Sequence, residues 1–301
     1  IIELMEQGST RGVKVMAFPE LCLTAYTCSD LFLQESLLRE AKKELKRILQ
    51  ASKSKDMILF VGMPWMHKGK LYNVAAVLNR GRILGIVPKK HLPNYSEFYE
   101  LRHFNPGMEK VEMTDWEGVQ VPMGMNLLFA CRIMPELVLA AELCEDVWVP
   151  CPPSISHALA GATVIANCSA SDETTGKDQY RYNLICGQSA RLVCGYIYAN
   201  AGEGESSQDL VFGGQNIIAE NGTCLVQSDL FKNACICADL DLGRIISERR
   251  RMTTFRDEEN RSASYETVYF ELNTEDSAKK DSKKAGQKRD ELLRYIDPAP
   301  F

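Results

Sequence analysis

Hydrophobic positions recur at helical spacing in several stretches of the chain. The longest, LFLQESLLREAKKELKRILQAS at 31–52, places apolar residues three and four positions apart with charged residues between them. This is the pattern of a helix that buries one face. The same pattern predicts the end of an amphipathic helix at 1–11 and further helices at 154–161, 178–194 and 241–252.

Short apolar runs between these helices predict buried strands. The dipeptides Arg80-Gly81 and Asn221-Gly222 predict tight turns at the ends of two of these runs. The predicted strands are 13–18, 57–64, 72–79, 82–88, 119–123, 126–133, 136–143, 162–167, 195–201, 211–220 and 234–241.

Strands and helices interleave from the first residue to about 273 without an internal boundary. This favours a single α/β domain over 1–273. Residues 274–290 (TEDSAKKDSKKAGQKRD) are charged and poor in large apolar side chains. We therefore interpret 274–301 as a charged arm and the start of a linker.

Composition excludes several classes of protein. The net charge of −5 and the pI near 5.6 give no basic footprint for nucleic acid. No apolar run reaches the roughly 18 residues that a membrane helix needs. The N-terminus lacks the basic region and cleavage site of a signal peptide, and it does not start with Met. We expect a segment of a longer cytoplasmic protein with no membrane partner.

Eleven cysteines are present, most of them in apolar contexts such as LLFAC and ACIC. This usage indicates reduced, buried thiols in a cytosolic enzyme. There is no CxxC pair, and the chain has four histidines, none at the spacing of metal ligands. We therefore predict no metal site.

Three predicted strands end at a residue able to take part in catalysis. Glu20 follows VKVMAFP, Lys89 follows RILGIVP, and Cys144 follows LVLAAEL. Loops at strand ends are where α/β proteins place their sites. Together these residues supply a base, a cation and a thiol, which suit amide hydrolysis through a thioester.

Each of these residues also has an ordinary explanation. A glutamate after a strand is usually a solvated cap, a lysine a surface charge, and a cysteine part of the core. A Cys-His protease site is the alternative chemistry. It is disfavoured because none of the four histidines lies in a context that suggests a catalytic base.

Three blocks give the chain a specific resemblance. FPEL (18–21), PKxxLPNYxEFYExRxF (88–104) and ELCEDVW (142–148) resemble the signature blocks of the nitrilase, or carbon–nitrogen hydrolase, superfamily. Longer segments resemble the N-terminal glutaminase domain of glutamine-dependent NAD synthetases over nearly the whole chain. These segments are FPELCLTAYTCSDLF, ANCSASDETTGKDQYR, YIYANAGEGESSQDLVFGGQNIIAENG and the closing YIDPAPF.

The resemblance implies a four-layer αββα sandwich and a role for each matching residue. Glu20 matches the general base and acid, Lys89 the oxyanion-stabilising lysine, and Cys144 the nucleophile. Lys90 is the rival for the lysine position. We prefer Lys89 because the family lysine directly follows the strand-ending proline. The remaining matches are supporting roles for Glu100 and Glu145, and glutamine binding by Tyr95, Ser171 and Lys177.

The resemblance also implies a reaction and partners. L-glutamine would be hydrolysed to glutamate and ammonia, and the ammonia would serve a C-terminal synthetase domain that amidates nicotinic acid adenine dinucleotide. No pyrophosphatase loop occurs in this chain, so ATP and Mg²⁺ belong to that absent domain, and no cofactor is expected here. We expect a homo-oligomer. The alternatives are a stand-alone amidase or nitrilase and a catalytically silent assembly domain.

Two further expectations concern details of the domain. The family fold opens with a strand before the first helix, and this chain begins inside that helix, so one edge or central strand position is expected to be vacant. The ammonium of Lys89 is expected to lower the pKa of the Cys144 thiol from about 8.5.

Overall fold

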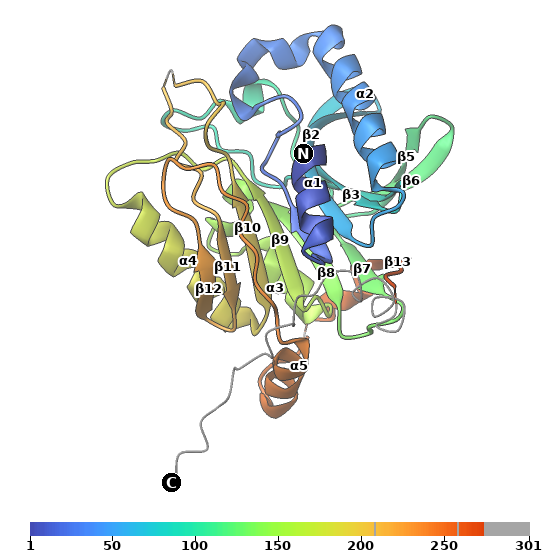
Figure 1. Ribbon diagram of the computed structural model, residues 1–301, viewed down its shortest axis with the longest axis vertical. Coiled ribbons are helices and arrows are strands. Elements are labelled where there is room, and N and C mark those ends of the chain that lie inside the picture. Colours follow the sequence, from blue (N-terminus) through green and yellow to red (C-terminus); the bar gives the residue numbers. More distant parts are fainter. Residues whose placement is uncertain (208, 258, 274–301) are drawn as a thin grey trace.

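The computed structural model of the protein describes residues 1–207, 209–257 and 259–273. Within them, two β-sheets lie face to face and helices cover the outer surfaces (Figure 1). Helices α1 (Ile2–Thr10) and α2 (Glu35–Ser52) cover the first sheet. Helices α3 (Pro153–Leu159) and α4 (Lys177–Leu192) cover the second. The predicted four-layer αββα sandwich is confirmed. The arm and linker at 274–301 lie outside the described residues.

The first sheet has six strands among the described residues, in the order β1-β2-β3-β4-β6-β5. β2, β3 and β4 form an antiparallel meander, with β1 parallel to β2 and β6 parallel to β4. The order is continuous, so no central position of the described sheet is vacant. The strands are β1 (Val15–Ala17), β2 (Ile58–His67), β3 (Lys70–Asn79), β4 (Arg82–Pro88), β5 (Glu112–Trp116) and β6 (Val119–Met123).

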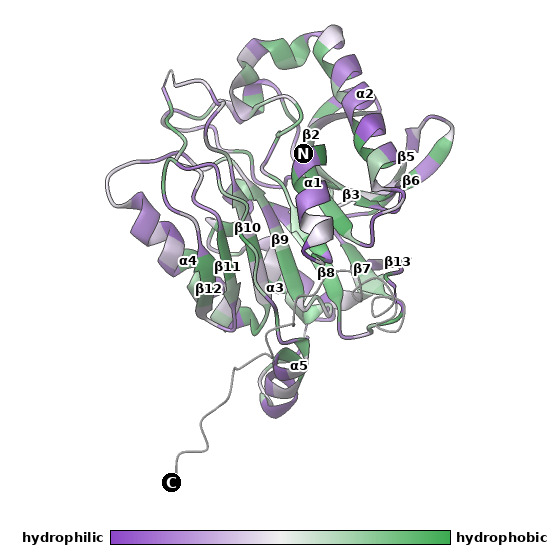
Figure 2. Ribbon diagram, viewed as in Figure 1, coloured by the Kyte–Doolittle hydropathy of each residue, from purple (hydrophilic) through white to green (hydrophobic). Residues whose placement is uncertain are grey.

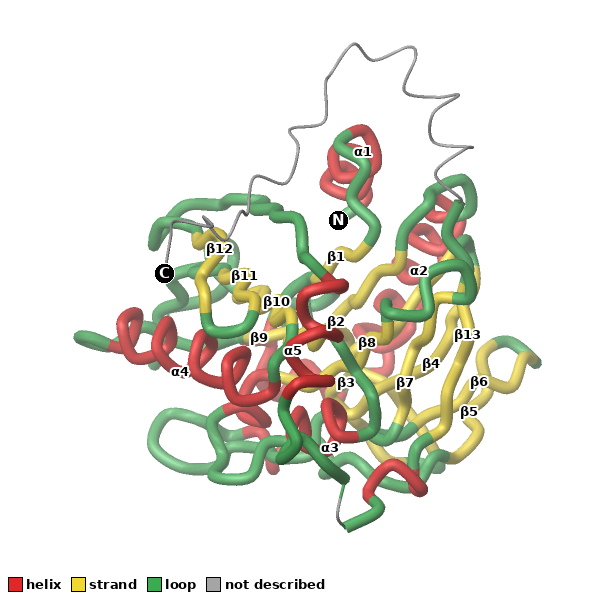
Figure 3. The backbone as a smooth tube through the Cα atoms, turned by 90° about the horizontal axis from the view of Figure 1, so that it is seen from below, coloured by secondary structure: helices red, strands yellow, loops and turns green. Residues whose placement is uncertain are grey.

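The second sheet has seven described strands, in the order β12-β11-β10-β9-β8-β7-β13. β8, β9 and β10 are parallel, so their carboxyl ends lie at one edge of the sheet. The strands are β7 (Leu127–Cys131), β8 (Val138–Leu143), β9 (Val164–Ser169), β10 (Gly195–Asn200), β11 (Ile217–Glu220), β12 (Thr223–Gln227) and β13 (Glu266–Phe270). In Figure 3, α1 and α4 lie on opposite sides of the strands.

The sequence pattern explains how the layers pack. Successive side chains of β2 point to opposite faces, as in any strand. Leu59 and Val61 therefore pack under α1 and α2, while Ile58 and Phe60 pack between the sheets. The ring of Phe60 meets that of Phe129 from the second sheet, with centroids 6.2 Å apart. In Figure 2 most of the strands are coloured hydrophobic, while much of α2 and α4 is coloured hydrophilic.

Most predicted elements are confirmed, including both Gly-containing turns, where Arg80, Gly81, Asn221 and Gly222 all have positive φ. The helix at 241–252 is α5 (Leu242–Arg251), capped by the Asp241 side chain. The described helices are all too short or too polar to cross a bilayer.

Three predictions about elements were wrong. The helix at 31–52 is divided: a 3₁₀ helix, η1 (Tyr26–Leu33), ends at an extended Gln34 before α2 begins. The strand at 211–220 is reduced to β11. Residues 234–241 form no strand, although they begin with an apolar run, because no described strand pairs with them. Strands β5, β12 and β13 had not been predicted.

Gly62 of β2 allows the chain after β1 to cross close to the strand. A Cβ at this position would lie 2.3 Å from the Pro19 carbonyl oxygen and 2.5 Å from the Leu21 nitrogen. Those contacts are with backbone, which has little freedom to move away. Gly62 therefore fixes how closely the segment that carries Glu20 approaches the sheet.

Gly62→Ala should lower the free energy of unfolding by about 1–3 kcal/mol, because overpacking forces the backbone to shift. Urea denaturation measures the change. Gly187→Ala is the control: this glycine lies inside α4 with no neighbour within 4 Å of an added Cβ. Its substitution should stabilise the protein by about 0.5–1 kcal/mol. Equal effects of the two substitutions would contradict the crowding at Gly62.

Candidate active site

The structure brings Glu20, Lys89 and Cys144 into one buried cluster. Glu20 follows β1, Lys89 follows β4, and Cys144 follows β8. Glu20 and Lys89 are fully buried, and Cys144 is 6% exposed. The backbone N–H of Glu20 donates to the Ser169 carbonyl at 3.3 Å, which joins the first sheet to the second at this point.

Lys89 lies between two carboxylates. Its Nζ is 2.7 Å from Oε1 of Glu20 and 2.6 Å from Oε1 of Glu100. Burial opposes the charge on the ammonium, but the carboxylates of Glu100 and Glu20 outweigh it and raise the pKa of Lys89 well above its ordinary value. The lysine therefore remains a cation at every physiological pH.

Glu100 is the second carboxylate of this cluster. Burial and the nearby charge of Glu20 raise its pKa from 4.5 to about 7, against the opposing effect of Lys89. The Tyr26 hydroxyl donates to Oε1 of Glu100 at 2.7 Å. Tyr26, Phe98 and Glu100 also line a small hollow that borders the cluster.

Glu20 has one occupied and one open carboxylate oxygen. Asn73 of β3 donates from Nδ2 to Oε1 at 2.6 Å, and Lys89 donates to the same oxygen. Oε2 is buried and has no hydrogen-bond partner among the described residues. A buried carboxylate oxygen without a partner is costly, so it is a position where a proton or a substrate group would bind favourably.

Cys144 begins a short 3₁₀ helix, η3 (Cys144–Val147), in a left-handed backbone conformation with φ of 40°. Burial and the charge of Glu20 raise the pKa of its thiol, while Lys89 and a hydrogen bond with the Ser169 side chain act in the opposite direction. The expectation of a lowered thiol pKa was wrong, because desolvation outweighs the single nearby ammonium. The thiol is therefore protonated in the resting protein.

The other residues predicted for the site lie around the cluster in two groups. One is Tyr95 with Glu145, and the other is Ser171 with Lys177. The Tyr95 hydroxyl donates to Oε1 of Glu145 at 2.9 Å, and Tyr95 is exposed. Ser171 is buried after β9, and its hydroxyl accepts from Nη2 of Arg181 at 3.1 Å. Lys177, at the start of α4, forms an ion pair with Asp172. Its ammonium also lies 5.5 Å from the centroid of the Trp148 ring.

Sequence reasoning missed several residues that organise the cluster. Asp146 accepts hydrogen bonds from the backbone N–H groups of Leu143, at 3.1 Å, and His91, at 2.9 Å. It thus ties the loop of Cys144 to the loop of Lys89. Asp146 and Tyr26 lie inside the quoted sequence blocks, but nothing in the sequence pattern distinguishes them from their neighbours.

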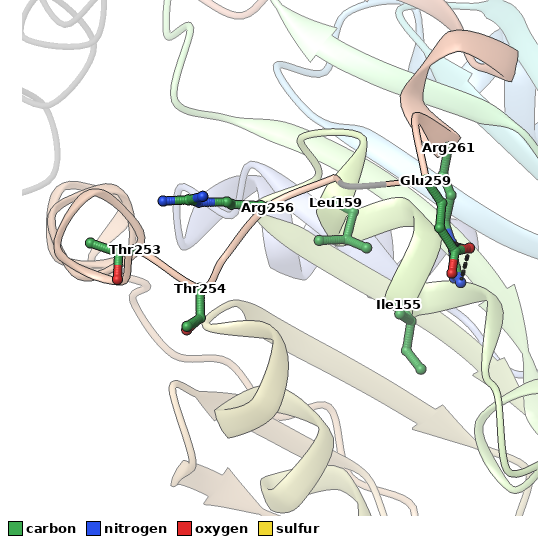
Figure 4. Close-up of a pocket in the computed structure, with 7 residues that line it drawn as sticks. All are labelled: Ile155, Leu159, Thr253, Thr254, Arg256, Glu259 and Arg261. Carbon is green, nitrogen blue, oxygen red and sulfur yellow. Dashed lines mark hydrogen bonds and ion pairs between the residues drawn. The ribbon is translucent and has the colours of Figure 1, made fainter.

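A larger hollow lies elsewhere, between α3 and the segment after α5 (Figure 4). Ile155 and Leu159 of α3 line it, the ion pair of Glu259 with Arg261 lies close to them, and Thr253, Thr254 and Arg256 lie on the far side. Among its described lining residues, the hydroxyl groups of Thr253 and Thr254 form no hydrogen bond with a basic side chain, and no thiol is present. Among the described residues, no group of three or more His, Cys, Asp or Glu side chains is placed to hold a metal ion.

Two stacked sheets between helical layers define the αββα class of α/β proteins. Glu20, Lys89 and Cys144 lie at strand ends of this fold, and Glu100 joins them from a 3₁₀ turn, Glu100–Arg102. The family model for carbon-nitrogen hydrolases matches residues 1–250. The chain belongs to this family.

Individual proteins and solved structures are also similar to this chain. The glutamine-dependent NAD(+) synthetase of Mycobacterium tuberculosis (strain ATCC 25618 / H37Rv) is 42% identical over 259 residues, which is 85% of this chain. The chain spans 38% of the length of that relative. The crystal structure of a glutamine-dependent NAD(+) synthetase from Cytophaga hutchinsonii matches with a TM-score of 0.68 and 28% identity, over 76% of this chain and 37% of that one.

A carbon-nitrogen hydrolase from Helicobacter pylori G27 shares the fold with a TM-score of 0.67 at 19% identity. The match covers 85% of this chain and 88% of that one. The αββα fold of this chain therefore corresponds to nearly all of the Helicobacter pylori protein.

Glu100→Gln should change how stability depends on pH. The folded protein holds the Glu100 proton more tightly than the unfolded chain, because the pKa rises from 4.5 to about 7 on folding. This contribution to stability is complete below the unfolded pKa and is lost as pH rises through the folded pKa. Between about pH 5 and pH 8, the wild type should lose on the order of 2 kcal/mol more than the variant.

Urea unfolding at a series of pH values tests this difference. Glu35→Gln, which removes an exposed carboxylate at the start of α2, serves as the control. Its stability curve should run parallel to that of the wild type. A parallel curve for Glu100→Gln as well would show that Glu100 binds protons equally in the folded and unfolded states.

Proposed function

We propose that this chain is the glutamine-hydrolysing part of a glutamine-dependent NAD synthetase, with Cys144 as nucleophile. The observation that carries the proposal is the buried Lys89, held between Glu20 and Glu100 within electrostatic range of the Cys144 thiol. Membership of the carbon-nitrogen hydrolase family and the 42% identity to a glutamine-dependent NAD(+) synthetase support the choice of glutamine.

The raised thiol pKa sets the first requirement of the reaction. A protonated thiol is a poor nucleophile, so a base must remove its proton as it attacks. Glu20 is the candidate, because its Oε2 is buried and without a hydrogen-bond partner among the described residues. The sulfur then attacks the carboxamide carbon, and the proton passes from Glu20 to the departing ammonia. Glu20 then takes a proton from a water molecule that attacks the thioester carbon, and as the C–S bond breaks to release glutamate this proton returns to the Cys144 sulfur.

Lys89 stabilises the negative oxygen of each tetrahedral intermediate. An ammonium has three N–H donors. Two of them are directed to Glu20 and Glu100, which leaves one for the oxyanion. A donor fixed in a water-poor site needs no reorganisation when the charge develops. Glu100 keeps the lysine charged and in place, and Glu145 supports Tyr95 at the edge of the site.

The substrate's amino-acid end is assigned to Tyr95, Ser171 and Lys177. Lys177 is a cation beside the site and suits a carboxylate, while its partner Asp172 suits an ammonium. Tyr95 and Ser171 offer hydroxyl groups. These assignments rest on the family resemblance together with the position of the three residues around the cluster.

The rest of the NAD synthetase reaction is assigned to a part of the protein outside this chain. That part would use ATP and Mg²⁺ to activate nicotinic acid adenine dinucleotide, and it would receive the ammonia released here. The relatives support this because the chain spans only about two fifths of their length. We assign no cofactor to the glutaminase part, and we place the protein in the cytoplasm as a homo-oligomer.

Cys144→Ala should abolish glutamine hydrolysis and leave the fold intact, because the thioester route has no substitute for the sulfur. Ammonia release from glutamine measures the activity, and circular dichroism checks the fold. A chloroketone analogue of glutamine should add to wild-type protein once, at Cys144, as located by peptide mass spectrometry. Labelling at the partly buried Cys22 or the exposed Cys151 instead would refute the assignment.

The substrate is tested in the same assay. Glutamine should be hydrolysed with a higher kcat/KM than asparagine or simple aliphatic amides. A preference for a simple amide would favour a stand-alone amidase. A correctly folded wild-type protein without activity toward any of them would favour an assembly role.

Lys89→Met should lower kcat by about a hundredfold or more, the scale of losing one oxyanion donor. The methionine keeps the length of the apolar stem and removes the charge. Lys90→Met is the matched control, because the Lys90 ammonium lies 2.6 Å from Glu109 at the surface. Its kcat should stay within about twofold of the wild type, as for an exposed ion pair. The reverse order of effects would assign the oxyanion role to Lys90.

A further inference from the structure

A chain of buried polar groups leads away from the backbone of Cys144 into the second sheet. Its members are Asn167 on β9, Tyr196 on β10 and Glu142 on β8. Each is at most 1% exposed. The reaction proposed above uses none of them, so their burial in a hydrophobic sheet requires another explanation.

In this series of polar groups, every hydrogen bond is donated in the direction away from Cys144. The Cys144 backbone N–H donates to Oδ1 of Asn167 at 3.0 Å. Nδ2 of Asn167 donates to the Tyr196 hydroxyl at 3.1 Å. The Tyr196 hydroxyl in turn donates to Oε1 of Glu142. The series of hydrogen bonds thus ends at the Glu142 carboxylate, which accepts hydrogen bonds and donates none when ionised.

This direction fixes the orientation of the Asn167 amide. The Tyr196 hydroxyl gives its single proton to Glu142, so it faces Asn167 as an acceptor and requires the amide nitrogen there. The amide oxygen must then face Cys144. If the amide were turned over, its oxygen would face the oxygen of Tyr196, and its NH₂ group would face the N–H of Cys144.

Glu142 is itself held in place. Its Oε2 accepts from the backbone N–H of Ser154, in the first turn of α3, at 2.8 Å. The Ser154 hydroxyl accepts from Gln188 of α4 at 2.9 Å. Burial raises the pKa of Glu142 to about 7, while Tyr196 and Ser154 act against the rise. At pH 8 the carboxylate is therefore predominantly ionised.

Cys144 needs such support because its backbone is strained. A non-glycine residue in the left-handed region costs roughly 1–2 kcal/mol, and it stays there when its surroundings hold it. Its N–H is the first of η3 and has no partner within that helix. Asn167 supplies this partner, at the residue whose sulfur must be placed against both substrate and base.

We propose that Asn167 is a positioning residue that holds the nucleophile in its strained turn, with Tyr196 and Glu142 fixing the orientation of its amide. The inference rests on the proposed function only in taking Cys144 as the nucleophile. Asn167 acts through the backbone of Cys144. Its loss should therefore affect the chemical step and the reactivity of the thiol and leave substrate binding nearly unchanged.

The test compares Asn167→Leu and Tyr196→Phe with the wild type at about pH 8, where Glu142 is predominantly ionised. Leucine nearly matches asparagine in size but cannot accept the Cys144 N–H. Phenylalanine removes one hydroxyl. Three quantities are measured for each protein: kcat and KM for glutamine, the rate constant for alkylation of Cys144 by iodoacetamide, and Tm. Peptide mass spectrometry restricts the alkylation rate to Cys144.

Asn167→Leu should lower kcat by about a hundredfold, the effect of misplacing a reacting group by about 1 Å, with KM within about twofold. Alkylation of Cys144 should slow by about tenfold or more, since the thiol no longer meets its base. Tyr196→Phe should change both rates in the same direction by about tenfold, because Asn167 remains but its orientation is no longer fixed.

Asn79→Leu is the matched control. Asn79 is a buried asparagine at the end of β3, in the first sheet, whereas Asn167 lies in the second. The side-chain nitrogen of Asn79 donates to the Met57 carbonyl at 3.0 Å. It should lower Tm to a similar extent as Asn167→Leu and leave both rates within about twofold of the wild type. This separates a loss of positioning from a general loss of stability.

Several outcomes would overturn the proposal. One is a folded Asn167→Leu whose kcat and alkylation rate match those of the wild type. Another is a Tyr196→Phe protein with raised KM and unchanged alkylation. If Asn167→Leu does not fold, Tyr196→Phe decides alone. If the wild type does not hydrolyse glutamine, the proposed function fails, whereas the alkylation rates still test the positioning of Cys144.

Discussion

The buried ammonium of Lys89 constrains the rest of the structure. Transferring a charge from water to a protein interior is unfavourable by several kcal/mol unless charged partners and hydrogen bonds compensate. Here the partners are the carboxylates of Glu20 and Glu100, and removing Lys89 would leave two buried carboxylates without a cation. The three groups come from separate segments, so the fold must bring these segments together closely and hold them. Hydrogen bonds and close backbone contacts around the site hold these segments together.

The backbone near the site is shaped for close approach. Gly62 admits the segment that carries Glu20, and Gly107 admits that of Lys89, where a Cβ would lie 2.8 Å from the Lys89 carbonyl oxygen. The carboxylate of Asp146 joins the loops of Lys89 and Cys144 through their backbone N–H groups. Strand ends thus carry Glu20, Lys89 and Cys144, and backbone contacts between the loops hold these strand ends close together.

The sequence predicted the parts of the site that depend on local pattern. Glu20, Lys89 and Cys144 each end an apolar run, so the strand pattern alone places them at strand ends. Asn167 and Tyr196 lie inside such runs, and their role depends on the lateral pairing of β8, β9 and β10, which no local pattern reveals. The thiol pKa could not be predicted either, because the depth of burial outweighs the neighbouring charge.

The same distinction explains the errors in the fold. Residues 234–241 contain an apolar run like that of a buried strand but find no partner among the described strands, whereas β13 pairs with β7 across more than a hundred residues of sequence. Strand formation is decided by the partner as much as by the pattern. Helices depend less on distant partners, which is why α2, α4 and α5 were predicted to within a few residues, apart from the break at Gln34.

The two sheets supply different residues of the proposed site. The first sheet carries the charged groups Glu20 and Lys89, and the second carries Cys144 with the asparagine that supports its backbone. The proton exchange that we propose between Glu20 and Cys144 therefore depends on how one sheet lies against the other. The apolar layer between them, where Phe60 packs on Phe129, controls that position. Because a displacement of about 1 Å can lower a rate about a hundredfold, the proposed reaction would depend on this hydrophobic layer as well as on the ion pairs.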